Sequence, residues 1–136
     1  NKDYFQEIAN WVEGYEGVVK YTLAGFQDNV ADYLRSFDIL INPAKAEPFG
    51  LIFIEAMYLE CVVIGSNEGA APEIIDDGIT GYIVDFDARD ESLQTLKKVV
   101  LNVTARKEVG RKALHSVREK FSINKQASQI EILLNS

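Results

Sequence analysis

Two glutamates separated by seven residues frame the segment of this chain that could carry chemistry. Glu47 comes just before Pro48 and Gly50, where an apolar helix is predicted to begin, and Glu55 lies within that helix. Pro48 and Gly50 leave backbone N–H groups free at the helix start, and Gly50 lets a ligand approach the backbone closely. Because a helix N-terminus carries the equivalent of about half a positive charge, this arrangement predicts a site for an anion such as phosphate.

Glu55 is the unusual residue of the predicted helix. A helix that is apolar on all sides is expected to be buried, and an unpaired buried carboxylate costs on the order of several kcal/mol. Hydroxyl groups of a ribose or a sugar could donate the hydrogen bonds that such a carboxylate needs. The helix rises about 9 Å from Phe49 to Glu55, so two carboxylates bracket the anion site over roughly the span of a nucleoside diphosphate sugar. The neighbours of Glu55 that define the apolar helix are Leu51, Ile52, Phe53, Ile54, Ala56 and Met57.

An alternative interpretation gives both glutamates purely structural roles. Glu55 would then bond a neighbouring backbone group, and Glu47 would cap the predicted helix. Spacing alone does not decide between a ligand site and these local contacts.

The bulk composition is that of one globular domain. With 136 residues, of which 47% are hydrophobic and 26% charged, the chain is long enough to bury a core. Its net charge of −7 argues against nucleic acid or an anionic membrane as the main partner. Its apolar runs are too short to cross a bilayer.

The chain contains one cysteine, Cys61, and one histidine, His115. Cys61 lies in an apolar run and is predicted to be a buried core thiol, whereas His115 lies on a polar helix and is predicted to face solvent. One residue of each kind gives no basis for a zinc site or for a Cys–His nucleophile pair, so we expect no metal site.

Short apolar strands alternate with helices along the chain. This alternation predicts an α/β fold, in which a parallel sheet carries helices on both faces. Ligands of such sheets bind beyond the carboxyl ends of the strands, which directs attention to the loops at 25–28, 42–50 and 66–72. The predicted strands are 18–23, 37–42, 61–65 and 80–84; the predicted helices are 3–13, 29–36, 49–59, a turn at 72–75, 90–101, 104–120 and 123–134.

The segment from Glu47 to Glu55 resembles the E-x7-E motif of the family-4 retaining glycosyltransferases, which have the GT-B fold of two Rossmann-like domains. The resemblance extends from about residue 18 to residue 134 and concerns the second, donor-binding domain of that family. Further matches, in chain order, are 37–43 with "aDvfvlPS", 55–57 with "EAM", 69–73 with "GG-x-PE", 77–81 with "DGxTG" and 119–122 with "erFsw".

The resemblance implies a role for each residue around the predicted helix start. Glu55 would hold the ribose hydroxyls of the donor, and the N–H groups of Phe49, Gly50 and Leu51 would contact the diphosphate and the transferred sugar. Glu47 would bond the sugar hydroxyls and act as the catalytic residue that stabilises an oxocarbenium-like transition state. Such enzymes are usually independent of metals and cofactors, and they retain configuration by front-face attack.

The loop with Phe26 and Gln27 would, by the same resemblance, lie beside the base of the donor. The sequence also departs from the family pattern in three places. Ala70 replaces a frequent glycine, Glu60 stands where a glycine often ends the helix, and Val62 replaces a frequent proline. These departures concern helix termination and loop flexibility more than donor contacts.

A diphosphate leaving group needs more positive charge than one helix terminus supplies. The family provides an Arg and a Lys from an earlier strand and loop that this sequence does not show. Lys45 is the only cation near the predicted anion site, and we expect it to be a solvated loop lysine. Residues 1–136 are therefore interpreted as a partial nucleotide-sugar-binding domain, an N-terminally incomplete half of a GT-B enzyme that is inactive alone.

The implied partners are a nucleotide sugar and the N-terminal acceptor domain of the same parent protein, with no nucleic acid. The resemblance implies a cytoplasmic protein of polysaccharide biosynthesis and leaves peripheral association with the cytoplasmic face of a membrane open. The nucleotide, the sugar and the acceptor are not indicated.

Two other functions are compatible with a similar fold. A sugar-nucleotide epimerase would need additional His and acidic groups that are not evident in the sequence. A non-catalytic regulatory domain would not need both glutamates together with Gly50, so their presence favours the transferase.

Overall fold

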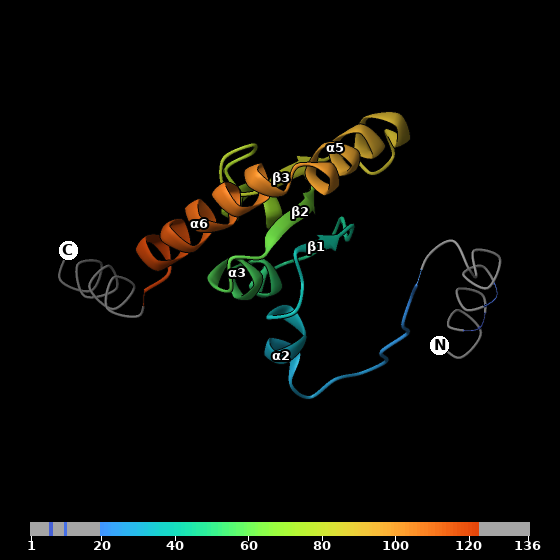
Figure 1. Cartoon of the computed structure of the whole chain (residues 1–136), viewed down its shortest axis with the longest axis horizontal. Helices are drawn as coiled ribbons and strands as arrows, with labels where there is room; N and C mark the ends of the chain where they lie inside the picture. Colours follow the sequence, from blue (N-terminus) through green and yellow to red (C-terminus); the bar gives the residue numbers. More distant parts are fainter. Residues whose placement is uncertain (1–5, 7–9, 11–19, 123–136) are drawn as a thin grey trace.

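Three short parallel strands form the centre of the described part of the chain, which comprises Gln6, Asn10 and residues 20–122 of a computed structural model (Figure 1). The strands lie in the order β1-β2-β3, and their registers pair Leu40 with Val63 and Gly65 with Ile83. The elements are α2 (Val30–Leu34), β1 (Ile39–Asn42), α3 (Leu51–Tyr58), β2 (Val62–Ser66), α4 (Ala71–Ile74), β3 (Tyr82–Val84), α5 (Arg89–Leu101) and α6 (Val103–Lys120).

Helices cover both faces of the sheet, as predicted. All five residues of β2 are buried, and successive side chains of a strand point to opposite faces. Val63 therefore packs in a core cluster with Phe53 of α3, while Ile64 packs in a second cluster with Val99 of α5. α3 and α5 accordingly lie on opposite sides of the strands (Figure 1).

α6 contributes to both clusters. Val109 belongs to the cluster on the α5 side, whereas Val117 belongs to the cluster on the α3 side. Between them, Gly110 lies against the backbone just before β2, where an added Cβ would be 2.2 Å from the carbonyl oxygen of Glu60. This close approach places α6 across the amino end of the central strand.

α3 ends in a Schellman motif. The N–H of Glu60 donates to the carbonyl of Met57 at 3.1 Å, and the N–H of Cys61 donates to the carbonyl of Ala56 at 3.0 Å. Glu60 has a φ of 60°, and within the described ranges it is the one residue other than glycine with a positive φ. Glu60, which stands where the family often has a glycine, therefore has a backbone conformation that favours glycine.

One predicted strand is wrong over its described part. Residues 20–23 of the predicted strand 18–23 are extended chain outside any sheet and are exposed. A strand needs a neighbour to satisfy its N–H and C=O groups, and the only neighbour of β1 among the described residues is β2. The predicted helix 123–134 and, apart from Gln6 and Asn10, the predicted helix 3–13 lie outside the described residues.

None of the helices in the described part of the chain has the length and apolar character needed to cross a membrane.

Candidate functional site

The loops that follow the three strands meet at the carboxyl edge of the sheet, where the ligand site was predicted. The N–H of Ala70, after β2, donates to the carbonyl of Glu47, after β1, at 2.9 Å. The N–H of Asn67 donates to the carbonyl of Val84, the last residue of β3, at 3.0 Å. Backbone hydrogen bonds thus connect the loop 67–70 to the loop 43–50 and to the end of β3.

Glu47 caps the N-terminus of α3 in this structure. Its Oε1 accepts the N–H of Gly50 at 3.0 Å and the N–H of Phe49 at 3.4 Å. Two of the three N–H groups predicted for the donor are therefore held by Glu47 itself, as the structural alternative expected. The third, the N–H of Leu51, donates no hydrogen bond within the described residues.

Gly50 is required at this helix start for two reasons. It is the N-cap residue of α3 and has a φ of 63°, in the left-handed region where residues with a Cβ are strained. An added Cβ would also lie 2.4 Å from Cδ1 of Ile74 and 3.3 Å from both Ala70 and Phe53. The helix start is consequently buried and closely packed at Gly50.

Glu55 is exposed, so the prediction that it is a buried carboxylate is wrong. α3 packs through Phe53, Ala56 and Met57, which are at most 1% exposed. The opposite face, which includes Glu55, carries the apolar residue Leu51 with an exposed fraction of 62%. The carboxylate of Glu55 is therefore accessible to a ligand.

Phe26 and Gln27 line a separate open hollow of about 350 Å³ between residues 24 and 37. Phe26 is 91% exposed, and the rest of the lining is largely apolar, with Tyr33 and Phe37 as its aromatic members. An apolar hollow with exposed aromatic rings suits a stacked base. Glu47 and Glu55 are not among the residues that line this hollow.

Lys45 is tied to acidic residues of the neighbouring loops. Its Nζ pairs with Oδ2 of Asp87, after β3, and lies 3.8 Å from Oε1 of Glu68, after β2. The hydrogen bond to Asp87 raises the pKa of Lys45, and the charges of Asp87, Glu68 and Asp85 act in the same direction. Asp87 and Glu68 were not predicted to be site residues, although both lie in loops directly after strands.

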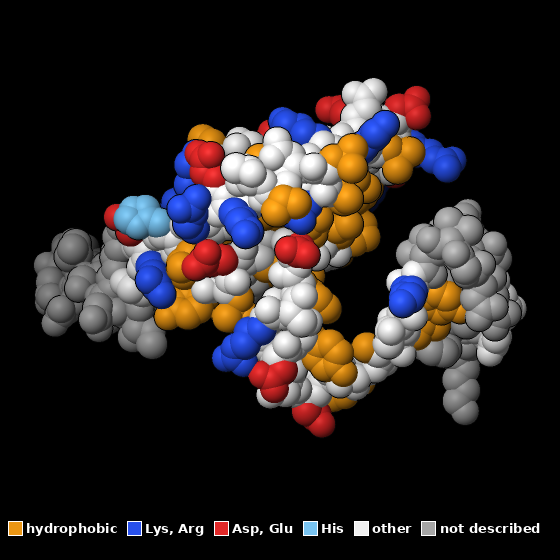
Figure 2. All heavy atoms as spheres, viewed as in Figure 1, with side chains coloured by type: hydrophobic (Ala, Val, Ile, Leu, Met, Phe, Trp, Pro, Cys, Tyr) orange, Lys and Arg blue, Asp and Glu red, His pale blue; other side chains and the backbone are white. Residues whose placement is uncertain are grey.

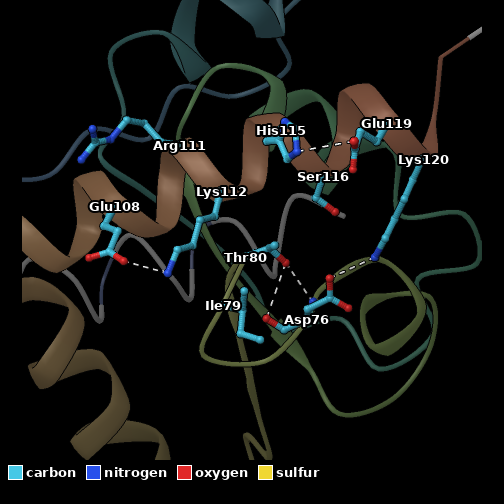
Figure 3. A pocket seen from close by; sticks show the side chains of 10 residues that line it. All are labelled: Asp76, Ile79, Thr80, Glu108, Arg111, Lys112, His115, Ser116, Glu119 and Lys120. Atoms are coloured by element: carbon cyan, nitrogen blue, oxygen red, sulfur yellow. Dashed lines mark hydrogen bonds and ion pairs between the residues drawn. The ribbon is translucent and has the colours of Figure 1, made fainter.

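A hollow of about 630 Å³ lies away from the predicted site, between α6 and the turn 76–80 (Figure 3). This turn precedes β3, so the hollow is at the amino end of the strand. Figure 2 shows basic and acidic side chains together on this face of the molecule, and at the hollow Lys112 and Lys120 each pair with an acidic residue. The ion pairs are Glu108–Lys112 at 2.7 Å and Asp76–Lys120 at 3.0 Å, and Nε2 of His115 lies 3.5 Å from Oε1 of Glu119.

Cys61 and His115 lie where the sequence predicted them. Cys61 is 1% exposed, and burial raises the pKa of its thiol to about 11, so it is not a nucleophile at neutral pH. The side chain of His115 is 75% exposed. Among the described residues, no three His, Cys, Asp or Glu side chains are grouped closely enough to hold a metal ion.

The family model described as "Glycosyl transferases group 1" matches residues 1–116. N-acetyl-alpha-D-glucosaminyl L-malate synthase of Bacillus anthracis is 35% identical over 113 residues, covering 80% of this chain and 29% of that protein. The human alpha-1,3/1,6-mannosyltransferase is 28% identical over 132 residues, covering 88% of this chain and 31% of that protein.

Two solved structures are similar in fold. Anabaena Alr3699/HepE in complex with UDP-glucose superposes with a TM-score of 0.82 at 21% identity and covers 99% of this chain and 37% of that one. The C-terminal domain of the group 1 glycosyl transferase LpcC from Francisella tularensis has a TM-score of 0.74 at 25% identity, covering 89% and 64%. The chain thus spans about 30% of the length of the curated relatives it matches.

Proposed function

The chain belongs to the group 1 glycosyl transferases, and from this membership we propose that it forms the nucleotide-sugar-binding part of a retaining glycosyltransferase. Its Rossmann-like α/β fold is that of the C-terminal half of GT-B enzymes. We propose that the acceptor domain and further phosphate-binding cations belong to the remainder of a longer parent.

One observation carries the proposal: an acidic residue, Glu47, sits on the N-terminus of α3 at the carboxyl edge of the sheet. A donor can meet backbone N–H groups and a carboxylate at this place together. The N–H groups suit phosphate or sugar oxygens, and the carboxylate suits sugar hydroxyls and developing positive charge. A Rossmann-like relative in complex with UDP-glucose supports a nucleotide sugar as the ligand class.

The proposed reaction uses Glu47 in two successive states. In the structure its carboxylate accepts the N–H groups of Phe49 and Gly50. When an oxygen of the nucleotide sugar accepts hydrogen bonds from these N–H groups in place of Glu47, the carboxylate is free. It can then accept hydrogen bonds from the hydroxyls of the transferred sugar. The bond from the anomeric carbon to the β-phosphate oxygen then breaks, and the acceptor oxygen bonds to that carbon on the same face. Attack on the same face gives retention of configuration. The acceptor's proton passes to the departing phosphate, so no protein base is needed.

Glu55 is proposed to hold the ribose. Its exposed carboxylate, one helical turn beyond Leu51 on the solvent side of α3, can accept hydrogen bonds from two adjacent hydroxyls. The hollow lined by Phe26 and Gln27 is proposed to receive the base.

The experiment is a transfer assay with the full-length protein and a panel of nucleoside diphosphate sugars, read by the anomeric proton coupling of the product in NMR. We expect one donor to be used with retention of the anomeric configuration, and we expect excess EDTA to leave the rate unchanged. An inverted product would contradict the proposed mechanism, and loss of activity in EDTA would contradict metal independence. The chain of 136 residues alone is expected to bind that donor only weakly, with a Kd near 1 mM, about −4 kcal/mol.

A further inference from the structure

One lysine connects the three loops at the carboxyl edge of the sheet. Lys45 is the only basic residue in the loops 43–50, 67–70 and 85–88. Its ammonium group pairs with Asp87 and approaches Glu68 to 3.8 Å. Because Lys45 follows β1, Glu68 follows β2 and Asp87 follows β3, a single side chain links all three strands' ends.

The backbone around Lys45 is coupled closely to Glu47. Glycine is needed at position 69, where a Cβ would lie 3.1 Å from the carbonyl oxygen of Lys45 and 2.9 Å from that of Glu47. The next residue, Ala70, donates its N–H to the same Glu47 carbonyl at 2.9 Å. A shift of the loop at Lys45 must therefore move the backbone that carries the Glu47 carboxylate.

Electrostatics keep Lys45 in this place. The hydrogen bond to Asp87 and the charges of Asp87, Glu68 and Asp85 raise the pKa of Lys45 and so favour its charged form. Without this cation, Glu68, Asp85 and Asp87 would repel one another across neighbouring loops. Exposed ion pairs contribute little to overall stability. Loss of the Lys45 cation is therefore expected to change the local geometry of the loops and not the global stability of the fold.

We propose that Lys45 is a positioning residue, which holds the Glu47 loop against the loops after β2 and β3 and so fixes the Glu47 carboxylate at the start of α3. This inference rests on the proposed function, since it concerns the placement of the group that serves the transferred sugar. Lys45 acts through Asp87 and Glu68 and does not itself touch the donor.

The test compares Lys45→Met, Lys45→Arg and Asp87→Asn in the full-length protein. A carboxylate displaced by about 1 Å can cost up to about 10²-fold in rate, so we expect kcat to fall on the order of 10-fold in Lys45→Met and in Asp87→Asn. The double variant should be no slower than the slower single variant, and Lys45→Arg should keep most of the activity. Affinity for free nucleoside diphosphate should be unchanged in all of them.

Lys112→Met is the matched control, because Lys112 is a comparably exposed lysine that pairs with Glu108 on α6. It should not change kcat. If Lys45→Met weakened nucleoside diphosphate binding while Asp87→Asn did not, Lys45 would be a phosphate ligand and the positioning role would be refuted. If Asp87→Asn restored the rate of Lys45→Met, Lys45 would act only by charge balance, which would also refute it.

Hydrogen exchange provides a readout that does not need activity. We expect the amide of Ala70, which donates to Glu47, to exchange at least about 10-fold faster in Lys45→Met and Asp87→Asn than in the wild type. If the exchange rate of the Ala70 amide were unchanged in both variants, the positioning role of Lys45 would be refuted, whether or not the wild type used a nucleotide sugar. An inactive wild type with faster exchange in both variants would instead refute the proposed function and leave the loop connection standing.

Discussion

Replacing Gly50 by alanine tests whether the start of α3 is as closely packed as the structure shows. Gly50 has a φ of 63°, and an alanine in the left-handed region costs roughly 1–2 kcal/mol. The new Cβ would also lie 2.4 Å from Cδ1 of Ile74, and overpacking of this kind typically costs about 1–3 kcal/mol. Alanine also lowers the conformational entropy of the unfolded chain, which offsets about 0.4–1 kcal/mol, so the expected net loss of stability is roughly 1–4.6 kcal/mol.

Gly78→Ala is the matched control for this substitution. Gly78 has a φ of 70°, but an added Cβ there meets no atom within 4 Å. Its expected loss of stability is therefore only the conformational part, roughly 0–1.6 kcal/mol after the unfolded-state gain. The difference between the two variants isolates the close packing at Gly50.

Urea denaturation of each purified variant, followed by circular dichroism, measures the loss of unfolding free energy in Gly50→Ala and in Gly78→Ala. The comparison requires equal m values for the variants and the wild type. Adding Ile74→Val to Gly50→Ala removes the atom nearest to the new Cβ and should recover part of the stability, so the two substitutions should not be additive. Equal losses in Gly50→Ala and Gly78→Ala, or full additivity with Ile74→Val, would refute this account of the helix start.

Three further predictions concern single residues. Glu60→Gly should raise the free energy of unfolding by up to about 1 kcal/mol, because Glu60 has a φ of 60° at the end of α3; a lower thermal midpoint would contradict this. The pKa of Cys61 is raised to about 11 in the folded chain from a usual 9.0. The contribution of this thiol to the free energy of unfolding should therefore be fully present below pH 9.0 and be lost as the pH rises towards 11. Cys61→Ala should lack this alkaline loss in denaturation series across pH. Glu47→Gln should lower kcat by about 10²-fold with little change in the KM for the sugar donor. An unchanged kcat would refute the catalytic role of Glu47.

Much of the fold follows from sequence pattern because the local signals agree. The strands β1 to β3, the helices α2 to α6 and the ligand-side loops lie within a few residues of their predicted ranges. The burial of Glu55 was predicted wrongly because α3 has no polar face in its sequence. Apolar residues all round a helix of eight residues do not ensure burial, since this one packs through a single side.

Two features of the site depend on tertiary contacts that a local pattern does not contain. The pairing of Lys45 with Asp87 joins residues 42 positions apart and follows only once three strands are aligned. The contact of Glu47 with the N–H groups of α3 was foreseen as an alternative, but the spacing of two glutamates is the same whether the carboxylate caps the helix or binds a ligand. The donor roles of Glu47, Glu55, Phe26 and Gln27 therefore stay predictions.

The most direct test of the central claim is a calorimetric titration of the full-length protein with UDP, comparing the wild type with Glu55→Gln and with Glu119→Gln. Glu119 is a suitable control because it is an exposed helical glutamate on α6, at the hollow opposite the proposed donor edge. If the exposed carboxylate on α3 holds the ribose, Glu55→Gln should weaken binding about 10-fold or more, the size of about 1.4 kcal/mol, and Glu119→Gln should leave it unchanged. Equal affinities for UDP in all three proteins would contradict the account, as would the absence of binding to UDP and to the other nucleoside diphosphates by the wild type.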